Sequence, residues 1–109
     1  MDFDNWKTQV RKGYLELCIL LLIQQNKRMY GFELLEKLEQ ISMPLKEGTL
    51  YPMLNRMTVE KILQAVWETE KIKGHPRKFY SLTKDGAKLL DEMKSEFEKM
   101  LIVYKTVQK

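Results

Sequence analysis

The stretch "KEGTLYPMLNRM", from Lys46 to Met57, holds a glycine and a proline inside a segment that otherwise has the pattern of an amphipathic helix. Leu50, Leu54 and Met57 are spaced i, i+4 and i+7, so they share one face of that helix. Glycine and proline both weaken a helix interior. Glycine also lets a backbone approach another surface closely, and proline is tolerated near a helix start, where its missing N–H would have no partner or a weak one. The pattern therefore predicts a helix whose outer face makes a contact.

The outer face of this helix carries residues that suit nucleic acid. On a helical wheel it is formed by Gly48, Thr49, Pro52, Asn55 and Arg56, with Tyr51 on a flank and Lys46 at the start. Asn and Arg side chains pair with base edges, Thr and Pro pack on a thymine methyl group, and a helix N-terminus attracts phosphate. Taken alone, the stretch is explained equally well as a turn followed by a solvated arginine.

Two helices are expected before this stretch. The first spans about residues 5–25, and its second half is apolar on nearly every side, as in a helix that several neighbours bury. After the polar turn "QNKRMYG" a second helix runs to about Ile41. The "SMPL" stretch ends it, because proline disfavours helical geometry at the preceding residue. The third helix is then expected over Lys46 to Glu60.

The composition changes after the third helix. "QAVWETE" and "RKFYSLT" are rich in the residues that strands favour, and "KIKGHP" between them holds turn residues. This predicts a two-stranded hairpin over about residues 64–82. Its tip carries positive charge without an acid, on Lys71, Lys73, Arg77 and Lys78, with His75 among them. Such a tip can lie along phosphates or enter a minor groove, although a solubilising loop has the same composition.

A long helix is expected at the end of the chain. Thr83 is a suitable N-cap, and the helix continues to about Val107, roughly 40 Å at about 1.5 Å per residue. Its apolar residues form a heptad stripe that a small three-helix core cannot cover along its whole length. We therefore expect a two-fold homodimer. The expected interface residues are Leu90, Met93, Phe97, Met100, Leu101 and Tyr104.

The composition limits the functions that the chain can have. Its 109 residues are 44% hydrophobic and 31% charged, as in one soluble globular domain. A net charge of +4 favours a polyanionic partner if the cations are gathered in one place. One histidine and one cysteine leave no nucleophile and base pair and no metal-ligand cluster, so neither catalysis nor a cofactor is expected.

The run "LELCILLLI" is too short to cross a bilayer, and the N-terminus lacks the pattern of a signal peptide. We therefore expect no membrane association and a cytoplasmic location. Cys18 within this run is expected to be a buried thiol that behaves as a small apolar residue. An interchain bridge or a redox sensor is the alternative role for it.

Three helices, a basic hairpin and a last helix follow one another in the order of a winged helix-turn-helix. The expected fold class is therefore mainly α with a small β-hairpin, a winged helix-turn-helix with a long C-terminal dimerisation helix. Residues 1–82 would form the DNA-binding region, with the wing at about 64–82. Residues 83–109 would form the dimerisation helix of the same single domain.

Four motifs, "MYGFELLEKL", "GTLYPMLNRM", "VWETE" and "GHPRKFYSLTKDG", occur in this order between residues 29 and 86, inside a match that runs over about residues 13–90. Together they resemble the PadR family of bacterial and archaeal transcriptional regulators. The resemblance implies a dimer that represses its target promoters and is often released by a small molecule or a stress signal. It places Thr49, Tyr51 and Pro52 at the DNA surface. The wing residues that match are Gly74, Pro76, Arg77 and Lys78.

The sequence departs from the family pattern at two places. Many relatives have an acidic residue, a glycine and leucines after the recognition helix, whereas this chain has "TVEKILQ", with Lys61 and no glycine. This difference concerns the turn into the wing. At His75 many relatives have an arginine, so the wing tip loses one permanent charge, and its binding to the DNA backbone would be weaker or would depend on pH. A single exposed histidine is more commonly incidental.

The expected partner is double-stranded DNA. A two-fold dimer sets two recognition helices about one DNA turn apart, roughly 34 Å, and so requires a palindromic operator. A small hydrophobic effector is a further partner, because in some multidrug-responsive relatives aromatic residues of the last helix line a cavity between protomers. Phe97, Met93 and Trp6 are the candidates here, although Phe97 is explained more simply as a dimer-core residue. The alternative function is a winged-helix module that binds protein or ligand without reading DNA.

Overall fold

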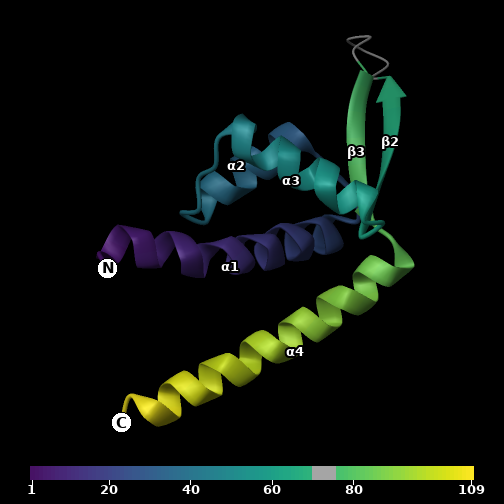
Figure 1. The fold of residues 1–109 in the computed structure, drawn as a ribbon. Helices are drawn as coiled ribbons and strands as arrows, with labels where there is room; N and C mark the ends of the chain where they lie inside the picture. Colours follow the sequence, from purple (N-terminus) through teal and green to yellow (C-terminus); the bar gives the residue numbers. More distant parts are fainter. Residues whose placement is uncertain (70–75) are drawn as a thin grey trace.

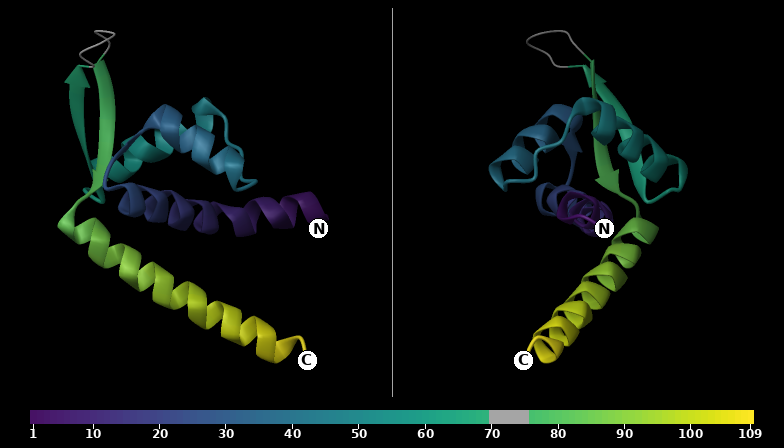
Figure 2. Two further views of the ribbon diagram at one scale, coloured as in Figure 1. Left: turned by 180° about the vertical axis from the view of Figure 1, so that it is seen from behind. Right: turned by 60° about the vertical axis from the view of Figure 1, so that its left-hand side comes forward.

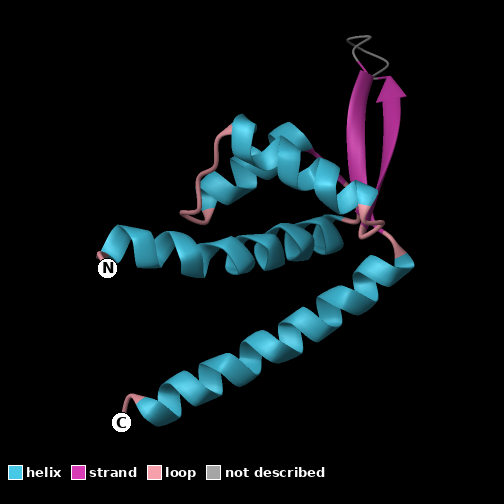
Figure 3. Ribbon diagram, viewed as in Figure 1, coloured by secondary structure: helices cyan, strands magenta, loops and turns pink. Residues whose placement is uncertain are grey.

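The computed structural model describes residues 1–69 and 76–109, which form four helices and three strands (Figure 1). In chain order the elements are α1 (Phe3–Asn26), β1 (Met29–Tyr30), α2 (Gly31–Gln40), α3 (Glu47–Val59), β2 (Leu63–Thr69), β3 (Pro76–Leu82) and α4 (Lys84–Val107). The four helices and the hairpin expected from the sequence are confirmed, with ends that differ by no more than about two residues. Most of the described chain is helical (Figure 3).

The sheet has three strands rather than the two of the expected hairpin. Its order is β1-β3-β2 and both pairs are antiparallel. Met29 pairs with Tyr80, and Tyr30 pairs with Phe79. The sequence analysis assigned Met29 and Tyr30 to a turn, because two residues are too few to show the alternation of a strand. Met29 and Tyr80 are both buried, so this face of the sheet belongs to the core.

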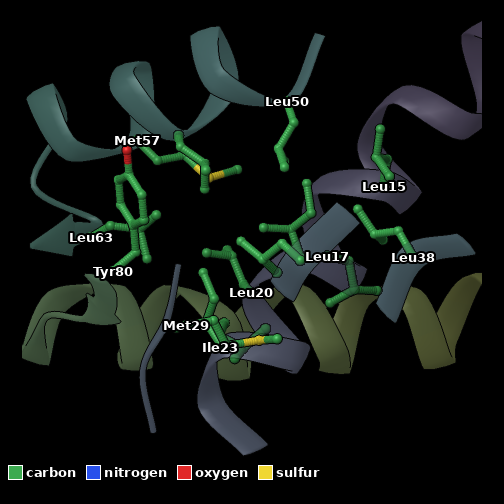
Figure 4. Packing of buried hydrophobic residues seen from close by; sticks show 14 of the residues in the cluster. Leu15, Leu17, Leu20, Ile23, Met29, Leu38, Leu50, Met57, Leu63 and Tyr80 are labelled. Atoms are coloured by element: carbon green, nitrogen blue, oxygen red, sulfur yellow. The ribbon is translucent and has the colours of Figure 1, made fainter. Parts of the chain in front are cut away.

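The core forms where α1, α2 and α3 meet the base of the sheet. The second half of α1 contributes Leu15, Leu17, Ile19, Leu20 and Ile23. Leu50, Leu54 and Met57 of α3 are buried as their spacing predicted, and Figure 4 shows Leu50 and Met57 pointing toward the side chains of α1. Cys18 is only partly buried, at the edge of this core, so the expectation of a buried thiol was too strong.

Two helices end without glycine at the position where glycine is most favoured. After α3, the N–H of Lys61 donates to the carbonyl of Thr58 at 3.1 Å, and that of Ile62 donates to the carbonyl of Met57 at 2.9 Å. These two bonds make a Schellman motif, which requires a left-handed backbone at the residue after the cap. Lys61 adopts it with φ 63. Ser42 adopts it after α2 with φ 62.

Pro52 lies inside α3 rather than at its start. The N–H groups of Thr49 and Leu50 already donate to the carbonyl of Lys46, at 3.0 and 3.1 Å. The N–H groups that lack a partner at the helix start therefore end before residue 52. A residue with an N–H at position 52 would donate a regular helical hydrogen bond to the carbonyl of Gly48, and the proline removes that bond. This corrects the expectation that the missing N–H would have had no partner or a weak one. Gly48 is exposed, so its carbonyl can bond to solvent instead.

The helix α4 begins at a junction with the end of α3. The Thr83 hydroxyl accepts from the N–H of Gly86 at 2.9 Å and donates to the carbonyl of Lys61 at 2.6 Å. The N–H of Thr83 donates to the carbonyl of Ile62 at 3.1 Å. A methyl group on Gly86 would overlap that same carbonyl. The glycine therefore lets the first turn of α4 pack directly on the turn that follows α3.

From this junction α4 runs back along α1, and its C-terminal half turns away from the other elements in both views of Figure 2. Among the helices of the described residues, none has the length and hydropathy needed to cross a membrane.

Replacement of Lys61 by glycine tests the strain at the end of α3. Because a left-handed conformation costs a residue with a side chain about 1 kcal/mol more than it costs glycine, we expect Lys61→Gly to raise the free energy of unfolding by about 0.5–1 kcal/mol. Lys61→Ala removes the same charge and keeps the strain, so it should give no such gain. Chemical denaturation measures both. A Lys61→Gly protein no more stable than Lys61→Ala would contradict this account.

Candidate nucleic-acid interface

The face of α3 that points away from the core is exposed along its length. Because Leu50, Leu54 and Met57 are buried, the opposite face is turned to solvent. The exposed residues of this face that were predicted to bind DNA are Lys46, Thr49, Tyr51, Pro52, Asn55 and Arg56. Lys46 is the N-cap residue of the helix, in extended geometry. Among residues 1–69 and 76–109, nothing lies within 4 Å of the position that a Cβ of Gly48 would take, so no packing between these residues requires a glycine there.

One flank of α3 faces the hairpin, and the space between them is a groove of about 570 Å³ that we call the wing groove. It is lined by Tyr30, Gly31, Phe32, Tyr51, Asn55, Trp67, Pro76, Arg77, Lys78 and Tyr80. The structure thus brings two predicted residues of α3, Tyr51 and Asn55, together with Arg77 and Lys78 of the hairpin. The groove has aromatic walls and two cations.

Tyr51 is positioned by its contact with the start of α2. Its phenol ring lies so close to Gly31 that any side chain at residue 31 would displace it. Burial raises the pKa of the Tyr51 hydroxyl above its ordinary value, and the charge of Glu47 adds to this effect. The hydroxyl is therefore protonated at neutral pH and can act as a hydrogen-bond donor.

The other flank of α3 faces α1. Thr49 and Arg56 line a second groove there, of about 440 Å³, together with Arg11 and Lys12. The Arg56 guanidinium forms ion pairs with Glu16 of α1 and, at 3.1 Å, with Glu60. Its hydrogen bond to Glu16 raises the pKa of Arg56 further. The ion pair occupies part of the guanidinium, and the role of Arg56 in base recognition stays a prediction.

The two cations of the hairpin that the structure describes are each held against aromatic rings. Arg77 lies over the ring of Tyr30, 4.4 Å from its centroid. Lys78 lies 5.8 Å from the centroid of Trp67 and 5.7 Å from that of Tyr80. A cation over an aromatic face is held in place while it remains accessible from the other side. The other predicted wing residues, Lys73 and His75, lie outside the described residues.

Arg28 joins the end of α1 to the hairpin. Two of its nitrogens bind the two carboxylate oxygens of Glu68 in β2, at 2.5 and 2.9 Å. Its guanidinium also lies over Phe79, 4.1 Å from the ring centroid. The hydrogen bond from Arg28 lowers the pKa of the Glu68 carboxyl, so this pair is fully charged at neutral pH.

A third groove, between α1 and α4, tests the predicted effector residues. It has a volume of about 710 Å³, and Met93, Phe97 and Met100 of α4 line it opposite Val10 and Tyr14 of α1. The ring of Phe97 stacks on that of Tyr14, with centroids 5.3 Å apart. Trp6 does not line this groove. It stacks on Phe3 nearer the N-terminus, with centroids 6.1 Å apart.

The predicted interface residues of α4 differ in how much of them is exposed. Leu90 is fully buried, so it fills the core of its own chain and is not available to a partner. Met93 and Phe97 are half-buried against that core. Beyond them the side chains are open to solvent, with Met100 56% and Tyr104 61% exposed. The apolar stripe is therefore uncovered only in the second half of α4.

The sequence analysis missed several residues that line these grooves. Trp67 is 64% exposed although its strand position puts it on the same face as Ala65. An exposed tryptophan beside a basic tip was the available signal. Tyr14 and Val10 were also missed, and their spacing of four residues from each other, continued by Leu17, indicates one face of α1.

Among residues 1–69 and 76–109, no cluster of three or more His, Cys, Asp or Glu side chains could hold a metal ion.

The comparisons with known proteins agree on one family. The model of the PadR-like family of transcriptional regulators matches residues 19–92. A PadR-like transcription factor from Bacteroides fragilis is 35% identical, with a TM-score of 0.79 over 94% of this chain and 98% of that chain. A PadR-like regulator from Bacillus cereus is 33% identical, with a TM-score of 0.82 over 93% and 97%. None of the curated proteins matches the chain.

A PadR family regulator from Eggerthella lenta, 24% identical, has the same fold with a TM-score of 0.84 over 97% of this chain and 91% of that chain. The family match covers the last third of α1, all of α2 and α3, the hairpin and the first turns of α4. The chain is therefore a winged helix-turn-helix protein that belongs to the PadR-like family of transcriptional regulators, which are not enzymes.

Proposed function

We propose that this protein binds double-stranded DNA through the outer face of α3 and the wing, and that it does so as a homodimer on a palindromic operator. The observation that carries the proposal is the wing groove. There Tyr51 and Asn55 of α3 lie beside Arg77 and Lys78 of the hairpin, although the two pairs are separated in the sequence. Amide and hydroxyl groups suit base edges, and the cations suit phosphates.

The exposed face of α3 supports close contact with a duplex. Gly48 leaves the backbone uncovered, Pro52 is also exposed, and no packing within the part of the chain that the structure describes accounts for the glycine. A backbone without side chains can lie against the phosphate–sugar surface, where N–H groups near a helix start favour anions. The weak helical residues of this stretch are thus explained by a surface that α3 contacts.

The second half of α4 supports the dimer. Met100 and Tyr104 expose more than half of their surface, and they continue the stripe that begins at Leu90. Apolar residues at heptad spacing on an unpaired helix are typical of a helix–helix interface. A second copy would cover them and would set the two recognition helices about one DNA turn apart.

We propose repression and release by a small hydrophobic effector from the family resemblance, and a cytoplasmic location because a regulator that binds DNA works where the DNA lies. The groove between α1 and α4, with Met93 and Phe97 in its wall, is the proposed effector site. Trp6 would join it only through the partner chain. Phe97 already stacks on Tyr14, so its role in the packing of these helices is independent of an effector.

DNA from the promoter region of the protein's own gene tests the proposal. We expect binding that weakens steeply between 50 and 200 mM salt, because each phosphate contact releases counterions. Arg77→Ala should weaken binding to all sequences and flatten the salt dependence. Lys105→Ala removes the same charge near the C-terminus and should leave both unchanged. Fluorescence anisotropy measures these constants, and binding that salt does not affect would point to an interaction module instead.

Gly48→Ala separates the stability of α3 from its contact with DNA. Because space around residue 48 is open, alanine should raise the free energy of unfolding by about 0.5–1 kcal/mol through its better helix propensity. The added methyl group should hold the backbone away from DNA and lower the affinity by about fivefold or more. Chemical denaturation and the anisotropy assay give the two values. A more stable protein with unchanged affinity would show that this part of α3 does not contact DNA.

Charges on the stripe of α4 test the dimer. Met100 and Tyr104 are exposed in the single chain, so Met100→Glu with Tyr104→Glu should leave the fold intact and convert the dimer into monomers. Ser95→Glu with Ile102→Glu adds the same charges on the opposite side of the helix and should stay dimeric. Light scattering during gel filtration gives the masses. A dimer with both stripe charges present would mean that the interface lies elsewhere.

A further inference from the structure

The wing carries one acid in the strands that the structure describes. Glu68 is the only acidic side chain in β2 and β3, over residues 63–69 and 76–82. In the strand register it lies directly opposite Arg77, next to the last described pair, Thr69 and Pro76. It is therefore close to the tip, where contact with DNA is proposed. A negative charge at this place opposes the attraction between the wing and phosphate.

Arg28 reaches this acid by crossing the sheet. The strand order is β1-β3-β2, and Arg28 directly precedes β1, so its side chain passes over Phe79 of β3 before it meets Glu68 of β2. Two parallel bonds, at 2.5 and 2.9 Å, occupy both oxygens of the carboxylate. These two hydrogen bonds and the contact with the Phe79 ring together fix the position of the guanidinium.

The exposure of this ion pair indicates what it does. Arg28 and Glu68 keep 48% and 46% of their side-chain surface in solvent. Ion pairs this exposed contribute little to folding stability. Their larger effect is on the electrostatic field at the surface, because the cation cancels the anion at short range. The pair therefore changes the charge of the wing more than it changes the stability of the fold.

We propose that Arg28 is a positioning residue for nucleic-acid binding, which acts by neutralising Glu68 beside Arg77 rather than by contact with DNA. The inference rests on the proposed function. Without Arg28 the carboxylate of Glu68 would be a bare anion near the tip of the wing and would repel phosphate there. With Arg28 in place, that negative charge is cancelled at short range.

A double-mutant cycle on the full chain tests this inference. The variants are Arg28→Gln, Glu68→Gln and the two combined, measured by anisotropy on promoter DNA and by the salt concentration at which each elutes from immobilised heparin. Lys27→Gln is the matched control, because it removes the same charge from the neighbouring residue. Lys27 has a positive φ of 66, and glutamine, which also has a side chain, does not relax that backbone as glycine would. Arg28→Lys keeps the charge but cannot make the two parallel hydrogen bonds to Glu68.

If Arg28 acts by neutralising Glu68, the two single variants should change DNA binding in different ways. Arg28→Gln should weaken binding by about three- to fivefold and elute earlier from heparin, because it leaves a bare anion on the wing. Glu68→Gln should bind as tightly as the wild type or up to about threefold more tightly, and the double variant should return to within about twofold of the wild type. Arg28→Lys should bind like the wild type, and Lys27→Gln should lose less than about twofold.

Other results would overturn the inference. If Glu68→Gln weakened binding as much as Arg28→Gln, with no recovery in the double variant, the pair would act as a mechanical anchor. If Lys27→Gln matched Arg28→Gln, only the net charge would matter. A wild-type protein that binds heparin but no DNA would remove the proposed function, while the heparin elution order would still decide the role of Arg28.

Discussion

The burial of one face of α3 in the core that it shares with α1, α2 and the sheet determines how the rest of the molecule can work. Leu50, Leu54 and Met57 are removed from solvent almost completely, and burying side chains of this size stabilises a fold by about 1.5–3 kcal/mol each. A helix fixed on one side has no freedom to rotate. Its opposite face, with Gly48 and Asn55, is therefore exposed whatever else the chain does. The orientation of the proposed DNA-binding surface is a consequence of the core.

The same core also sets where the wing and α4 begin. The turn after α3 is closed by the Schellman bonds of Lys61 and Ile62, and the carbonyl groups of these two residues receive the bonds from Thr83. Gly86 packs on the same turn. The helices α3 and α4 are thus joined at one point by hydrogen bonds. A change in the angle of α4 would move the end of α3, which gives a physical route between the proposed dimer interface and the proposed DNA-binding face.

Local patterns in the sequence predicted the elements well, because helical spacing, caps and strand composition are properties of neighbouring residues. The buried face of α3 and the N-cap at Thr83 are examples. The strand β1 was missed because its partner lies about fifty residues away and two residues carry no period. Lys61 takes the conformation that glycine favours, so the absence of a glycine did not prevent the turn.

Contacts between distant residues were beyond sequence reasoning. The ion pairs Arg56–Glu16 and Arg28–Glu68 each join residues 40 positions apart, and no spacing rule predicts them. They changed how the candidate site is understood. Arg56, a predicted DNA-binding residue, also pairs with Glu16 of α1, whereas Arg28 was not a candidate and pairs with Glu68 of the hairpin.

The most direct test of the account is a hydroxyl-radical footprint of the wild-type protein on DNA from its own promoter region. Two-fold symmetry with paired recognition helices predicts two protected segments on one side of the duplex, with centres about one helical turn apart and the same pattern on both strands. A single protected segment, or protection without any repeat, would contradict the claim that two copies of α3 and the wing bind DNA together.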